Sequence, residues 1–84
     1  MLFAQTPPEG NEERAYQEFQ AIQALRSDGQ YDEAIQQLSE IIKEYSDSER
    51  VLREAYNHLV TTYRAKGDRD GAIQAARDAL GQME

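Results

Sequence analysis

A histidine and a carboxylate one helical turn apart come closest in this sequence to the spacing of a catalytic pair. His58 is the single histidine, and Glu54 lies four residues before it. Such a pair could transfer a proton, whereas a metal site usually needs three protein ligands. One histidine beside one acid falls short of that number. We therefore interpret His58 as a structural residue, at the surface or half-buried.

Two aspartates, Asp68 and Asp70, flank a predicted turn and could suggest a calcium site. No ligand loop of the required length follows them, and an aspartate at such a place commonly caps a helix. Ser46 and Ser48 have no histidine partner evident from the sequence, cysteine is absent, and no glycine-rich phosphate loop occurs. We therefore expect no catalytic residue, no metal site and no cofactor.

The charge balance excludes two classes of partner. The chain has 84 residues, enough for one small domain, and a formal net charge of −7. A protein that binds nucleic-acid backbone needs a basic face, and a helix on a membrane surface needs basic residues on its polar side. Neither pattern is present, and no apolar run approaches the roughly 20 residues of a membrane-spanning helix. We expect neither nucleic-acid binding nor membrane insertion.

Apolar residues recur at spacings of three and four along most of the chain, which predicts amphipathic helices and an all-α fold. Gly29 and Gly67 suit the left-handed conformation that ends a helix. The helices are predicted at about residues 12–28, 31–45, 47–66 and 69–82.

The sequence contains two tandem copies of one predicted helical hairpin. Each of the glycines at residues 29 and 67 is followed by a helix, and the apolar positions of the two helices match at a constant offset of 38 residues. The matched pairs are Ala34 and Ala72, Ile35 and Ile73, Leu38 and Ala76, Ile41 and Ala79, and Ile42 and Leu80. A helix–turn–helix unit repeated at such a period is typical of solenoid proteins.

The second copy resembles a tetratricopeptide repeat. An aromatic opens its first helix, a large and a small residue and another aromatic follow, Gly-Asp marks the turn, and small residues continue along the second helix. These residues are Tyr56, Leu59, Val60, Tyr63, Gly67, Asp68, Ala72, Ala76 and Ala79. The first copy matches best at its turn, residues 29–35, and departs from the family at Glu18, Leu38 and Ile41. The offset also exceeds the family's usual period of about 34 residues.

The resemblance covers roughly residues 15–82. It implies four antiparallel helices in two tandem helix–turn–helix repeats, about 15–46 and 53–83, forming a fragment of an α-solenoid. Proteins of this family bind an extended peptide or a partner helix in a concave groove lined by the first helix of each repeat. The implied function is a non-catalytic scaffold that binds a protein or peptide. The implied groove residues are Tyr16, Phe19, Gln23, Arg26, Glu54, Asn57, Thr61 and Arg64.

Two of these assignments have simpler alternatives. Tyr16 and Phe19 fall at helical spacing and could instead be core residues. Arg26 and Arg64 lie near helix C-termini and could complement the helix dipole, although arginines there could also bind a carboxylate with two hydrogen bonds. The family's carboxylate clamp is not reproduced, because Phe19 and Gln23 stand where that clamp has Lys and Asn.

Self-association is the alternative function. Two repeats are fewer than the three or so usually needed for stability, and no polar capping helix follows Leu80. An uncovered face would be satisfied by a second copy in a homodimer or by further repeats of a longer protein. The residues expected on that face are Ala72, Ala76, Leu80 and Met83.

Residues 1–10 are predicted to form a flexible leader, with Asn11 as the preferred cap of the first helix and Thr6 as the competing one. The residues Leu2 to Gln5 could be the end of a signal peptide. The linker at residues 45–48, Tyr-Ser-Asp-Ser, resembles the joints of repeat proteins in the bacterial cell envelope. Both features favour a bacterial envelope location, and a cytoplasmic one stays open.

Overall fold

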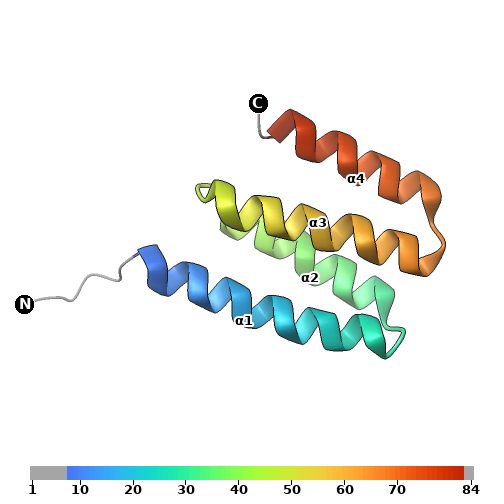
Figure 1. The fold of residues 1–84 in the computed structure, drawn as a ribbon, viewed down its shortest axis with the longest axis horizontal. Coiled ribbons are helices and arrows are strands. Elements are labelled where there is room, and N and C mark those ends of the chain that lie inside the picture. Colours follow the sequence, from blue (N-terminus) through green and yellow to red (C-terminus); the bar gives the residue numbers. More distant parts are fainter. Residues whose placement is uncertain (1–7, 83–84) are drawn as a thin grey trace, which may run out of the picture.

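The fold consists of four helices packed against one another (Figure 1). It was obtained as a computed structural model, which describes residues 8–82 and the side chains of residues 12–82; no strand occurs within that range. The predicted all-α class is confirmed. The helices are α1 (Pro8–Ser27), α2 (Tyr31–Glu44), α3 (Glu49–Lys66) and α4 (Arg69–Gln82).

Helix α1 begins at Pro8, earlier than the predicted start at about residue 12. Proline suits the first turn of a helix because its ring fixes a helical φ and its missing N–H would have no partner there. Gly10 therefore lies within the helix instead of preceding it. Residues 1–7 of the expected leader, including Thr6, lie outside the described residues.

Helix α3 starts about one turn after the end of α2, because Ser48 caps the N-terminus of α3. Ser48 is extended, with φ −106° and ψ 105°, and its Oγ accepts a hydrogen bond from the N–H of Val51 at 3.2 Å. The same hydroxyl donates to a carboxylate oxygen of Glu12 at 3.1 Å. The linker is thereby attached to α1, and α2 ends at Glu44, with Tyr45 only 8% exposed in the core.

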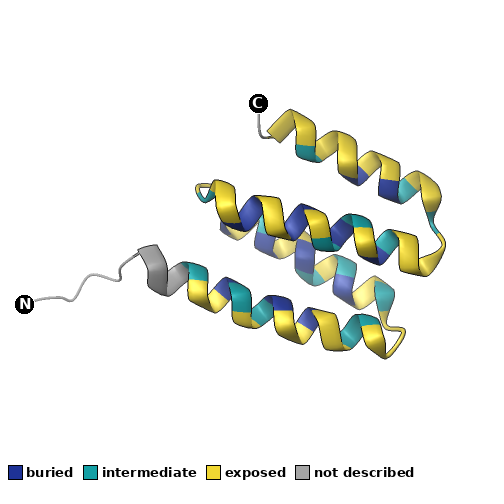
Figure 2. Ribbon diagram, in the orientation of Figure 1, coloured by how far each residue is buried: buried dark blue, intermediate teal, exposed yellow. Residues whose placement is uncertain are grey.

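Helix α3 is the centre of the packing. It contacts α1, α2 and α4, whereas α4 packs against α3 alone in the part of the chain that the structure describes. Figure 2 shows buried residues concentrated where α1, α2 and α3 meet, and a mostly exposed α4. The fully buried side chains with the largest volumes are Ile22, Leu38, Val51 and Thr62.

The two hairpins turn in the same way. Gly29 has φ +82° and Gly67 has φ +89°. The N–H of Gly29 donates to the carbonyl of Arg26 at 3.0 Å, and that of Gly67 to the carbonyl of Arg64 at 3.0 Å. In both turns the next N–H reaches the carbonyl five residues back, at 2.9 Å and 2.8 Å. These are Schellman motifs, and the offset of 38 residues between their positions is the one that relates the two sequences.

Replacing Gly67 with alanine is expected to lower the free energy of unfolding by about 1–2 kcal/mol, because a Cβ disfavours the left-handed conformation. Steric overlap does not contribute to this loss of stability, since a Cβ at this position would meet no atom within 4 Å. Gly29→Ala should cost the same amount for the same reason. Urea unfolding of both variants checks this, and Gly81→Ala, with helical backbone and open space, is the control that should lose nothing.

Candidate functional site

The eight groove residues implied by the family resemblance divide into two groups. Tyr16, Phe19 and Arg26 are buried or half-buried on α1. Phe19 is 4% exposed and belongs to the hydrophobic core, and the ring of Tyr16 lies 5.9 Å from it. The members with exposed side chains are Gln23, Glu54, Asn57, Thr61 and Arg64.

Arg26 connects α1 to α3 by hydrogen bonds. Its Nη1 donates to Oγ1 of Thr62 at 3.3 Å and lies 3.3 Å from Nδ1 of His58. Thr62 is fully buried and donates its own hydroxyl to the carbonyl of His58 at 2.7 Å. The guanidinium of Arg26 therefore has partners within the fold. Arg64, the equivalent residue of the second unit, is exposed.

His58 is held between an aromatic ring and two charged groups. Its ring stacks on Phe19 with centroids 5.0 Å apart, and its Nε2 lies 3.9 Å from a carboxylate oxygen of Glu54. Arg26 is always a donor, so Nδ1 accepts and the proton of the neutral imidazole lies on Nε2. Burial lowers the pKa of His58, Arg26 lowers it further, and Glu54 opposes the shift. The histidine positions α1 on α3.

The lowered pKa of His58 predicts an acid-sensitive contribution to stability. The unfolded chain binds the proton more tightly than the folded one, so this contribution is complete above the ordinary histidine pKa of 6.5 and is lost as the pH falls through the lower folded pKa. Urea unfolding should show that the free energy of unfolding falls less between pH 8 and pH 5.5 for His58→Gln than for the parent chain. Equal losses in both chains would contradict the account of Arg26 and His58.

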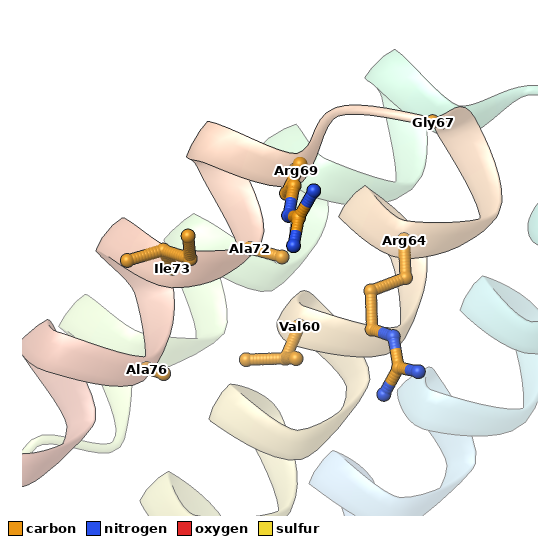
Figure 3. Close-up of a pocket in the computed structure, with 7 residues that line it drawn as sticks. All are labelled: Val60, Arg64, Gly67, Arg69, Ala72, Ile73 and Ala76. Atoms are coloured by element: carbon orange, nitrogen blue, oxygen red, sulfur yellow. The ribbon is translucent and has the colours of Figure 1, made fainter.

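An open depression of about 440 Å³ lies between α3 and α4 (Figure 3). Figure 3 shows Val60 on α3 and Ala72, Ile73 and Ala76 on α4 around its apolar part, with Arg69 toward the turn at Gly67 and the side chain of Arg64 extending from α3 away from that turn. We call this hollow the α3–α4 depression; its lining is Val60, Arg64, Gly67, Arg69, Ala72, Ile73 and Ala76.

An exposed apolar stripe continues from the depression along α4. Ile73 is 45% exposed and Leu80 is 71% exposed, and they are the large hydrophobic residues exposed among residues 12–82. Ala76 between them is exposed too. The spacing of three and four places all three on one side of the helix. We call Ile73, Ala76 and Leu80 the α4 stripe.

The α4 stripe overlaps the expected self-association face only in part. Ala76 and Leu80 lie on it, but Ala72 is only 7% exposed, although it lines the α3–α4 depression. Met83 lies outside the described residues. Ile73 is not among the residues expected on that face. The repeat nevertheless identifies it, because Ile73 is one of the five apolar positions of α4 that match apolar positions of α2.

Among residues 12–82 no group of three or more histidine, cysteine, aspartate or glutamate side chains is placed to hold a metal ion. Within the same residues no helix is both long and apolar enough to cross a membrane.

Comparison of the chain with protein-family models, with curated proteins and with solved structures finds no match. Function is therefore inferred from the internal repeat, the α3–α4 depression and the α4 stripe.

Proposed function

We propose that this chain is a non-catalytic protein-binding module built from two tetratricopeptide-like repeats. Three features support the proposal: one hydrogen-bonded turn that occurs twice, a constant offset between equivalent apolar positions, and contacts between each helix and the next. Modules of this architecture present helix faces to peptides or partner helices, and the partner proposed here is a protein.

The observation that carries the proposal is the pairing of the α3–α4 depression with the α4 stripe. Side chains such as Leu80, at 71% exposure, gain little from the fold itself and gain about 1.5–3 kcal/mol each when a partner buries them fully. A contiguous apolar patch beside a depression is typical of interaction surfaces. The exposed polar groove residues Gln23, Asn57 and Thr61 offer no comparable apolar area.

The experiment is affinity capture with the intact chain, followed by binding measurements with the purified captured protein. Leu80→Glu should raise the dissociation constant about tenfold or more, because it places a charge within the apolar contact. Thr61→Ala on the exposed polar side of α3 is the matched control and should leave binding unchanged. If Thr61→Ala weakened partner binding and Leu80→Glu did not, the binding surface would be the concave groove. That result would contradict its placement on the α3–α4 depression and the α4 stripe.

Self-association through the same stripe is the second candidate function, because Ile73, Ala76 and Leu80 would also serve a second copy. Light scattering over a range of concentrations separates the two. A monomeric mass throughout supports binding of a different protein, whereas a dimer that Leu80→Glu dissociates supports self-association.

A further inference from the structure

The α3–α4 depression has an equivalent in the first unit, and there it is covered. Subtracting the repeat offset of 38 from each lining residue gives the corresponding surface of α1 and α2 and the turn between them. That surface is Ile22, Arg26, Gly29, Tyr31, Ala34, Ile35 and Leu38. Ile22, Ala34 and Leu38 are 0% exposed, and they share one core cluster with Val51, Ala55 and Leu59 of α3.

The element that covers the first surface is α3, which contacts both α1 and α2. No described helix occupies the same place on the second unit, where α4 contacts α3 only. The α4 stripe shows the consequence. Leu38 is 0% exposed, but its equivalent Ala76 is exposed; Ile42 is half-buried, but its equivalent Leu80 is 71% exposed.

We propose that the α3–α4 depression and the α4 stripe bind one amphipathic helix of a partner protein, placed on α3 and α4 as α3 is placed on α1 and α2. This inference rests on the proposed function and specifies the kind of segment that the partner supplies. Its polar and apolar positions follow from the way α3 is held in the first unit.

Two polar contacts define the orientation of the covering helix. Near its C-terminal end, Lys66 donates from Nζ to Oδ1 of Asp32 at 2.7 Å. One turn earlier, the Thr62 hydroxyl accepts from Arg26. The equivalents of Asp32 and Arg26 on the second unit are Asp70 and Arg64, and both are exposed.

The partner helix should therefore carry a cationic residue near its C-terminal end, opposite Asp70. One turn earlier it should carry an acceptor opposite Arg64. A carboxylate fits that position better than a hydroxyl, because charge-assisted hydrogen bonds to guanidinium are the stronger kind, and Arg69 gives the depression a second positive charge.

The sizes of the lining residues define the apolar side of the partner. Ala76 stands where the first unit has Leu38, and Val60 stands where it has Ile22. The side chains at these two positions are therefore smaller on the second surface, where the open depression has a volume of about 440 Å³. Since interiors are close-packed, the helix that fills it needs a larger apolar side chain opposite Ala76 than α3 needs opposite Leu38.

A second copy of this chain does not supply such a helix. Its α1 is the element equivalent to α3, but the positions corresponding to Val51 and Ala55 are Glu13 and Gln17, both exposed. Burying them would leave polar groups without partners. A net charge of −7 on each copy also opposes close approach. Both features oppose a second copy bound through its α1.

The test selects helical peptides against the intact chain. The library has the sequence of residues 48–67, with the positions of Val51, Ala55, Leu59 and Thr62 randomised and Lys66 retained. Selected peptides should be enriched in a large apolar residue at one of the first three positions and in Asp or Glu at the fourth.

Two variants make the selection decisive. Ala76→Arg fills the α3–α4 depression without touching the surface that α3 covers, and it should weaken peptide binding about tenfold or more. Lys66→Glu in the peptide should also weaken binding, and Asp70→Lys in the protein should restore it, because the paired charges are then exchanged. Circular dichroism should show both protein variants folded.

The inference would be overturned by a library that yields no binder, by peptides that bind Ala76→Arg as well as the parent chain, or by a dimer of the intact chain that Ala76→Arg dissociates. Any of these results can coexist with a captured partner whose binding needs Leu80. In that case the proposed function stands and the helical occupant does not.

Discussion

Leu38→Ala is expected to lower the free energy of unfolding by about 2–5 kcal/mol, the range found when a buried leucine is truncated and its cavity persists. Leu38 is 0% exposed, and α3 covers the face of α2 on which it lies. A small domain has a total stability of about 5–15 kcal/mol. The loss should therefore be visible as a large shift of the urea midpoint.

The matched control is Ala76→Leu, which places leucine at the equivalent position of the second unit. Ala76 is exposed, and surface substitutions usually change stability by about 0.5 kcal/mol or less. Substitution at residue 38 should thus strongly lower the free energy of unfolding, and substitution at the equivalent residue 76 should hardly change it. If Leu38→Ala were as mild as its control, the covered and open faces described here would not differ.

Phe19→Ala is expected to cost about 3–5 kcal/mol, the usual range for a buried phenylalanine. Phe19 is 4% exposed, and its ring stacks on His58 at 5.0 Å. The variant loses core packing and the contact that supports His58 beside Arg26. Thermal unfolding followed by circular dichroism measures the effect.

Gln23→Ala, one turn further along α1, is the control for Phe19 and should be nearly neutral because Gln23 is exposed. The pair distinguishes the two interpretations of Phe19 that the sequence left open. Normal stability of Phe19→Ala together with lost partner binding would restore Phe19 to the groove and contradict its place in the core.

The helix boundaries could be predicted because their signals are local. Gly29 and Gly67 determine where two helices end, and the φ of each glycine is positive. The cap predicted at Asp68 is confirmed, because its Oδ1 accepts a hydrogen bond from the N–H of Gly71 at 2.9 Å. Helix α1 starts earlier than predicted, at Pro8, because proline is favoured in the first turn of a helix.

The candidate site was harder to predict because exposure depends on the neighbouring helix. Arg26 and Arg64 look equivalent in the sequence, yet Arg26 bonds Thr62 and Arg64 lines an open depression. Likewise Ile35 and Ile73 occupy one repeat position, and only Ile73 is exposed. Periodicity identifies the apolar face of each helix, but it does not tell which face lacks a covering helix.

The central claim is that the second unit leaves open the face that α3 covers in the first. Hydroxyl-radical footprinting of the intact chain tests it directly, because leucine side chains are oxidised in proportion to their exposure and the repeat supplies a leucine on each face. We predict rapid oxidation of Leu80, which is 71% exposed, and slow oxidation of Leu38, which is 0% exposed. Protection of Leu80 to the level of Leu38 would contradict the account, because the face would then already be covered.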